Sequence, residues 1–349
     1  MNILSSFSLA SAMSLSAAAL ATNAMAADNV VPKNLRIVIG SNSTSGDTYQ
    51  NAAIFAEALA QKLGINTKVD PVGASAGFKA LERADDGNTI MLFHDQSYLS
   101  YLYKVRGFDN MFEKFTVGPT LSINPGDAFL VPAKSPYKTI EDVIAAAGKG
   151  TKVRVAIQPG GVSAIGFSGL KNAVKVAHPG QEGNIVAVNT GSQSDKNQLL
   201  FDGNADLING SVQGNEQYTR LPADDQKAMR FVWVTARSAT LAQANSEGMG
   251  QTSRDQLMKF AEPNVKVPMD AKSPFAFDKE FFLLYNKNIK PEFVTAIDMA
   301  LTDIMAEGKI QETLKKSFFI PNFKPSKEAQ PYLKAKFDAT KKVIDNITE

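Results

Sequence analysis

Short β-branched runs and helical segments alternate along this chain in two successive series. The first series opens with LRIVI at 35–39, followed by a polar loop and by apolar positions at helical spacing over 49–63. A second strand is expected over 65–72, and the second series starts with a strand over 152–157. Strands that alternate with helices predict parallel sheets covered by helices. Because 349 residues correspond to about two domains, we expect an α/β protein with two sheets.

Periodicity and turn signals predict the remaining elements. Further strands are expected over 89–93, 129–131, 185–188, 207–208, 231–234 and 281–285. Helices are expected over 140–147, 164–176, 193–201, 291–306, 310–315 and 326–347, and loops over 243–254 and 263–274. Thr139 and Asp142 have the spacing of a capping box at the start of the helix 140–147. Trp233, inside an apolar strand, is expected in the core.

The first 26 residues have the features of an export signal. They contain no Lys, Arg, Asp or Glu, their centre at 10–21 is apolar, and they end in Ala24-Met25-Ala26, a pattern that signal peptidase recognises. The apolar stretch is shorter than the roughly 20 residues that span a bilayer. We therefore expect a cleaved signal peptide over 1–26 and a periplasmic protein; the alternative is a buried N-terminal helix.

Composition excludes several classes of protein. Lys and Arg number 37 against 35 Asp and Glu, without a basic stripe, which argues against nucleic-acid binding. The absence of cysteine rules out disulfides, thiolate metal sites and a cysteine nucleophile, and two histidines are too few for a His-rich metal site. No Gly-x-Ser-x-Gly elbow, Walker loop or His-Glu-x-x-His motif occurs. We expect a binding protein without cofactor or metal; a secreted hydrolase that uses an unrecognised serine is the enzymatic alternative.

Two strand-to-helix loops carry the functional signal. In the first, GSNSTSGDT at 40–48, every residue but Asp47 is Ser, Thr, Asn or Gly; the second is QPGGVS at 158–163. In open parallel sheets ligands bind beyond the carboxyl ends of the strands, where both loops lie. Each loop also leads into a helix N-terminus, with free N–H groups and the positive end of the dipole. Facing each other, they predict an anion site without a formal positive charge; alternatively, each is only a turn with an N-cap.

The candidate ligand-binding residues come from these loops. Hydroxyl and backbone donors are expected from Ser41, Ser43, Thr44 and Ser163, and backbone or amide donors from Gln158, Gly160, Gly161 and Val162. Asp47 is expected either to complement the helix dipole or to accept from a ligand ammonium or hydroxyl. His94 and Asp95 are neighbours after a strand and point opposite ways, so we expect a structural or rim role. His178 is expected to be exposed.

Over 31–347 the order of short motifs resembles the periplasmic solute receptors of tripartite tricarboxylate transporters. The motifs are Gly46-Asp47, AQKLG at 60–64, GASAG at 73–77, DGNT at 86–89, SPYKT at 135–139, Ser163 with Gly169, Gly191-Ser192 and DGNAD at 202–206. The resemblance implies a two-lobed, type II-like periplasmic-binding-protein fold with a mainly parallel sheet in each lobe. It places 27–127 and 241–349 in one lobe and 128–240 in the other. It further implies a monomer that closes on a carboxylate and delivers it to a membrane permease.

The chain departs from this family at several expected ligand positions. Asn189 and Thr190 stand where the family has an aromatic residue and a lysine, and Gly210, beside Asn209, stands where it has an acidic residue. We expect Asn189, Thr190 and Asn209 to contact the distal end of the ligand in a more polar pocket. Mono-, di- and tricarboxylates, aromatic acids and acidic amino acids remain open as ligands. A receptor of another uptake or sensing system is the alternative within the same fold.

Overall fold

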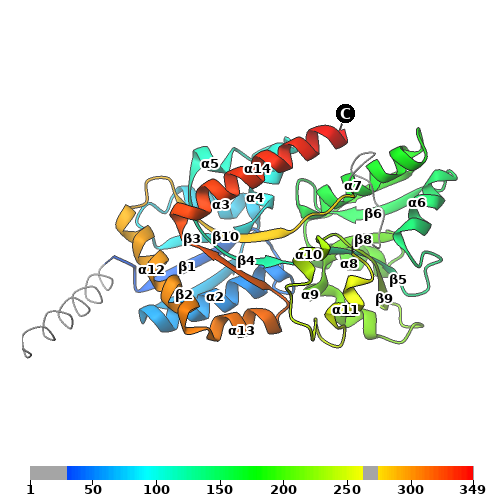
Figure 1. Cartoon of the computed structure of the whole chain (residues 1–349). Helices are drawn as coiled ribbons and strands as arrows, with labels where there is room; N and C mark the ends of the chain where they lie inside the picture. Colours follow the sequence, from blue (N-terminus) through cyan, green and yellow to red (C-terminus); the bar gives the residue numbers. More distant parts are fainter. Residues whose placement is uncertain (1–29, 262–273, 349) are drawn as a thin grey trace, which may run out of the picture.

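The protein consists of two α/β lobes side by side (Figure 1). The computed structural model describes residues 30–261 and 274–348. The expected signal peptide and most of the expected loop at 263–274 lie outside the described residues. Within them, no helix combines the length and the apolar composition that a membrane span requires.

The first lobe is built on a six-stranded sheet of order β11-β4-β10-β3-β1-β2. Its strands are β1 (Asn34–Ile39), β2 (Asn66–Pro71), β3 (Thr89–His94), β4 (Phe115–Asn124), β10 (Lys279–Asn286) and β11 (Ile320–Lys324). The apolar residues of one face pack against α2 (Asp47–Leu63), α12 (Pro291–Glu307) and α13 (Lys309–Lys316). Those of the other face pack against α3 (Ala74–Glu82), α4 (Gln96–Leu102), α5 (Met111–Lys114) and α14 (Ser326–Thr348).

Alternation along β10 shows why this sheet is covered on both faces. Phe281, Leu283 and Tyr285 belong to the core under α2 and α12, whereas Phe282 and Leu284 belong to the core under α3 and α14. Successive side chains of a strand point to opposite faces, so an unbroken apolar run requires burial on both.

The second lobe contains a five-stranded sheet of order β7-β6-β8-β5-β9. Its strands are β5 (Asp127–Pro132), β6 (Val153–Ile157), β7 (Ile185–Asn189), β8 (Leu207–Ser211) and β9 (Met229–Val234). One face packs against α6 (Ile140–Gly148) and α7 (Val162–Ala177). The other packs against α8 (Gln193–Phe201), α9 (Val212–Asn215), α10 (Ser238–Leu241) and α11 (Arg254–Met258). Thr139 and Asp142 form the expected capping box at the start of α6, and Trp233 is buried.

The two-lobed α/β fold with mainly parallel sheets is confirmed, since four of the six strands of the first sheet and four of the five strands of the second share one direction. In the first sheet β1 pairs in parallel with β2 and β3, whereas β10 is antiparallel to β3 and β4, and β11 to β4. In the second sheet β6 pairs in parallel with β7 and β8, whereas β5 is antiparallel to β8 and β9. β5 and β10 enter their sheets from the other lobe. They begin at the edge where their neighbours end, and therefore run against them.

The chain passes between the sheets at two places that touch each other. The first is Pro125–Gly126, between β4 and β5, and the second is the connection between β9 and β10, of which the structure describes residues 235–261 and 274–278. Gly126 has a φ of +108°, and a Cβ there would lie 2.6 Å from the backbone nitrogen of Ala236. The predicted lobe boundaries at 127/128 and 240/241 stay predictions.

Direct contacts hold the two lobes together. Ser43 Oγ lies 3.2 Å from Ser194 Oγ, and Ser100 Oγ donates to the Gly160 carbonyl at 3.1 Å. α14 extends from the first lobe to α7 of the second (Figure 1). The lobes are therefore in a closed arrangement.

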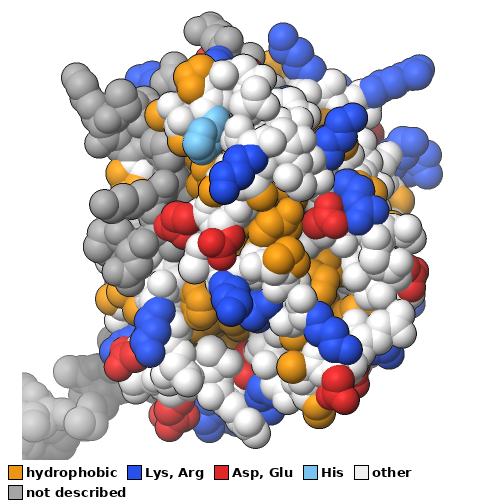
Figure 2. All heavy atoms as spheres, turned by 90° about the vertical axis from the view of Figure 1, so that its right-hand side faces the viewer, with side chains coloured by type: hydrophobic (Ala, Val, Ile, Leu, Met, Phe, Trp, Pro, Cys, Tyr) orange, Lys and Arg blue, Asp and Glu red, His pale blue; other side chains and the backbone are white. Residues whose placement is uncertain are grey.

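The outer end of the second lobe carries Lys and Arg side chains scattered among acidic and polar ones (Figure 2).

Candidate ligand-binding site

A cavity of about 50 Å³ lies between the lobes. Both lobes contribute to its wall, mostly through residues at or just beyond strand ends and in first helical turns: Gly40, Ser41, Gly46, Asp47, Thr48, His94, Gln96, Asp127, Gln158, Val162, Ser163, Gln193, Lys196, Ser211 and Lys279. This volume is smaller than the roughly 150 Å³ of a cavity that holds benzene, so binding an organic solute of several carbons requires the lobes to move apart.

Two helix N-termini meet at this cavity. α2 starts at Asp47 after the N-cap Gly46, and α7 starts at Val162 after the N-cap Gly161. Glycine has no side chain that could accept the first-turn N–H groups, so these donors remain available to a ligand. Asp47 and Thr48 of α2 and Val162 and Ser163 of α7 line the cavity. The structure therefore brings the two loops together, as the anion-site hypothesis requires.

The predicted site residues divide into two groups. Ser41, Asp47, Gln158, Val162 and Ser163 line the cavity. The others lie outside its lining: Ser43, Thr44, Gly160, Gly161, Asn189, Thr190 and Asn209. Among these, Ser43 is buried between Ser45 and Ser194, Thr44 and Asn189 are exposed, and Thr190 bonds to the Ile157 carbonyl.

Internal hydrogen bonds fix the shape of the second loop. Ser163 Oγ accepts from the backbone N–H of Gln158 at 2.9 Å, which closes the loop before α7. Gly160 has a φ of +68°, and its carbonyl accepts from Ser100 of the other lobe. These bonds keep the first turn of α7 directed at the cavity.

Two buried lysines line the cavity, so the expectation of an anion site without a fixed cation is wrong. Lys279, on β10, places Nζ 2.8 Å from Asp47 Oδ2, and both side chains are buried. Burial lowers the pKa of Lys279, but the nearby Asp47 and Asp127 outweigh this and raise it above its ordinary value. Sequence reasoning missed the pair because its members lie 232 positions apart.

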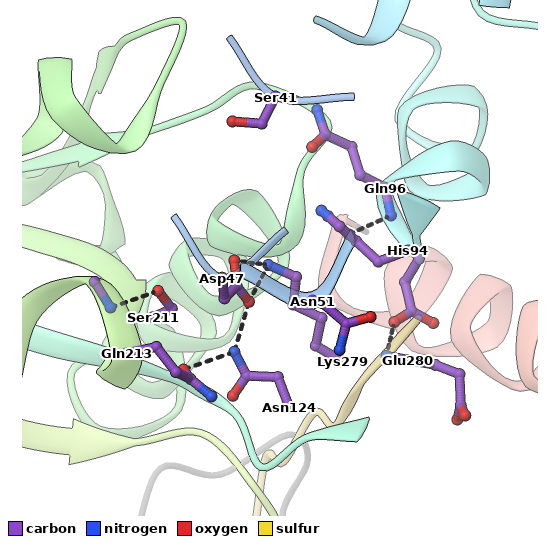
Figure 3. Close-up of polar contacts among 12 residues, drawn as sticks. Ser41, Asp47, Asn51, His94, Gln96, Asn124, Ser211, Gln213, Lys279 and Glu280 are labelled. Carbon is purple, nitrogen blue, oxygen red and sulfur yellow. Dashed lines mark hydrogen bonds and ion pairs between the residues drawn. The ribbon is translucent and has the colours of Figure 1, made fainter. Parts of the chain in front are cut away.

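Asp47 is therefore part of a polar network rather than an N-cap (Figure 3). Asn124 Nδ2 donates to Asp47 Oδ2 at 2.6 Å and to Gln213 Oε1 at 3.1 Å. Gln213 in turn donates to the Phe318 carbonyl at 3.0 Å. This network links the start of α2 to β4 of the first sheet and to α9 of the second lobe.

The second lysine, Lys196, comes from the buried face of α8. Its Nζ donates to the Asn209 carbonyl at 2.5 Å, and only 5% of the residue is exposed. Burial lowers the pKa of Lys196 to about 8, although Asp127 acts in the opposite direction. Lys196 is thus a cation at neutral pH that loses its charge in mildly alkaline solution.

His94 lines the cavity as a neutral ring, and its hydrogen bond with Gln96 is consistent with the structural or rim role that we expected for it. Its Nδ1 accepts from the backbone N–H of Gln96 at 3.2 Å, so the neutral ring carries its hydrogen on Nε2. Burial, followed by the charges of Lys279 and Lys336, holds the pKa of His94 well below its ordinary value. Asp95 points elsewhere, accepting from Tyr98 and from the Glu280 N–H.

Comparison with known proteins supports the fold. No protein-family model matches the chain, and no curated protein sequence does. Among solved structures, BugD, a periplasmic binding protein, has a TM-score of 0.68 at 18% identity over 91% of this chain and 98% of its own. MatC (Rpa3494) from Rhodopseudomonas palustris, with bound malate, has a TM-score of 0.69 at 14% identity and covers 90% of this chain and 99% of its own. R. palustris Rpa4515, with adipate, has a TM-score of 0.70 at 14% identity and covers 91% of this chain and 98% of its own. The chain therefore has the two-lobed fold of periplasmic binding proteins.

Proposed function

We propose that this protein is a non-enzymatic periplasmic receptor. It captures a small organic carboxylate between its lobes and delivers it to a membrane permease. The observation that carries the proposal is the meeting of the α2 and α7 N-termini at one cavity between the lobes. MatC with malate and Rpa4515 with adipate, which have this fold, are consistent with a carboxylate ligand. The resemblance to tripartite tricarboxylate transporter receptors supports the same assignment.

The energetics of such a site are sufficient. A helix N-terminus contributes up to ~2 kcal/mol to anion binding when partly buried. Charge-assisted hydrogen bonds add roughly 1.5–3 kcal/mol each. Four or five donors from Ser41, Thr48, Val162, Ser163 and Lys196 would reach the ~8 kcal/mol of micromolar affinity after the costs of association.

Binding and closure are coupled in this proposal because the carboxylate contacts both lobes. A solute that touches the α2 and α7 turns together stabilises the closed arrangement over an open one. The Ser43–Ser194 contact and the Ser100–Gly160 hydrogen bond form only when the lobes are together. A permease could then distinguish the loaded receptor from the empty one by its shape.

The test is a thermal-shift screen of the mature chain from Ala27 onward against a library of mono-, di- and tricarboxylates, followed by calorimetry. We expect at least one carboxylate to raise the midpoint of unfolding saturably and to bind one per chain. Turnover of ester substrates without any carboxylate binding would overturn the proposal in favour of a hydrolase.

A further inference from the structure

Asp127 is a buried carboxylate without a matching partner in the cavity wall. It is the first residue of β5, directly after the Pro125–Gly126 crossing, and only 4% of it is exposed. Among the described residues its Oδ1 has no hydrogen-bond partner. Burying a carboxylate in this way is costly unless a donor or a cation accompanies it. The residue therefore requires a partner that the described part of the chain does not supply.

The two lysines of the cavity each have a partner other than Asp127. Lys279 pairs with Asp47, and Lys196 donates to the Asn209 carbonyl. Neither lysine comes within the 4.0 Å of an ion pair to Asp127, although both act on it through space. Burial raises the pKa of Asp127, and these two lysines only partly offset that effect.

The charge balance of the cavity limits which solutes suit it. The wall carries two acidic and two basic side chains, and His94 is neutral, so its formal charge is zero. A simple carboxylate adds one negative charge to this cavity, and a dicarboxylate adds two. A zwitterion leaves the balance unchanged and brings a cation that can lie beside Asp127.

We propose that the solute is an amino acid, whose carboxylate binds the N-terminal turns of α2 and α7 and whose ammonium group donates to Asp127. This inference rests on the proposed function and specifies its ligand class. An ammonium group has three donors and no acceptor, which matches a carboxylate that lacks donors around it. A hydroxy acid supplies a donor but not the positive charge.

Calorimetry on the mature protein with three matched sets of ligands tests this inference: L-alanine, L-lactate and propionate; L-aspartate, L-malate and succinate; L-glutamate, L-2-hydroxyglutarate and glutarate. In at least one set we expect the amino acid to bind roughly tenfold or more tightly than both analogues, which is the effect of one charge-assisted contact. The variant Asp127→Asn should reduce this preference to less than about threefold, because its amide has no charge to pair with the ammonium group.

Asp298→Asn is the matched control. Asp298, on α12 outside the cavity lining, accepts from the Ser326 N–H at 3.0 Å and is partly buried. This variant should keep the preference for the amino acid. If Asp127→Asn does not fold, as judged by circular dichroism, the comparison within the wild-type sets decides the ligand class alone.

The outcomes separate this inference from the proposed function. Equal or tighter binding of hydroxy or deamino analogues in every set that binds, or an unchanged preference in Asp127→Asn, would overturn the amino-acid assignment and leave the carboxylate receptor intact. Failure of every carboxylate, amino acids included, would overturn both.

Discussion

Lys279 and Asp47 form a buried ion pair, 2.8 Å from Nζ to Oδ2, that joins the start of β10 to the first turn of α2. Each side chain has only 7% of its surface exposed. The lysine neutralises a carboxylate that would otherwise repel an anion at the α2 N-terminus. The pair therefore contributes both to stability and to the chemistry of the cleft.

Replacing Lys279 by Met should destabilise the protein by about 3–5 kcal/mol, because it leaves the buried Asp47 carboxylate unpaired. Urea unfolding followed by tryptophan fluorescence measures the change. Lys287→Met, at an exposed lysine just after β10, is the control and should change the free energy of unfolding by less than about 0.5 kcal/mol. The double variant Asp47→Asn/Lys279→Met should recover most of the loss. Equal unfolding curves for Lys279→Met and Lys287→Met would show that the Lys279–Asp47 pair contributes nothing to stability.

The sequence contained a signal for both cavity lysines, although it did not identify their partners. Lys279 has the same strand phase as Phe281 and Leu283, and Lys196 lies one helical turn before the buried Leu200. A lysine in a core-facing position is unusual unless it is paired. The partners lie on other elements, so only the folded chain shows what each lysine meets.

Local features of the fold were predictable, and so were three of the four strands next to the crossings (β5, β9 and β10), whereas β4 was not. The start of α8, the capping box of α6 and the two loops follow from neighbouring residues. β4 was missed because Gly118 and Pro119 interrupt its sequence, and its ladder with β10 is irregular there. Gly118 is needed at this point, since a Cβ would lie 2.6 Å from the Tyr285 ring.

Ser163→Pro is predicted to weaken carboxylate binding by roughly tenfold or more, because proline removes an N–H from the first turn of α7. Ser163→Ala keeps that N–H and loses only the Oγ that closes the loop at Gln158, so it should bind more tightly than the proline variant. Calorimetry with whichever carboxylate the screen identifies gives the comparison.

Glu292→Pro is the matched control for this change. It places proline at the second position of α12, which lies outside the cavity lining, and should leave affinity unchanged. A ligand-induced thermal shift that survives Ser163→Pro would show that the second loop does not hold the carboxylate.

Lys196 should make the stability of the ligand-free protein rise between about pH 8 and pH 10.5. Burial lowers the pKa of Lys196 from 10.5 to about 8, so in this window the unfolded chain binds more protons than the folded one. The cost of burying the charged ammonium is complete below pH 8 and absent above pH 10.5, a change of about 3 kcal/mol. Lys279 titrates outside this window because its pKa is raised.

Urea unfolding of the wild type and of Lys196→Met across this pH range isolates the contribution of Lys196 to the free energy of unfolding. The stability of the wild type relative to the variant should increase with pH, since the methionine carries no charge to bury. Lys287→Met should keep the wild-type slope. Parallel curves for wild type and Lys196→Met would mean that Lys196 keeps its ordinary pKa in the fold.

Gly126→Ala should destabilise the closed arrangement of the lobes. At this crossing φ is +108°, and a Cβ would lie 2.6 Å from the Ala236 nitrogen, so the methyl group forces the two crossing segments apart. Gly107→Ala is the matched control: its φ is +87°, but nothing lies within 4 Å of its Cβ position. Both variants carry the backbone strain of a positive φ, about 1–3 kcal/mol, and only Gly126→Ala adds the clash.

Small-angle scattering should therefore show a larger radius of gyration for Gly126→Ala alone. Solute binding should also be weaker in this variant, because the closed arrangement then includes the clash. The same radius in both variants would place the pivot of the lobes elsewhere.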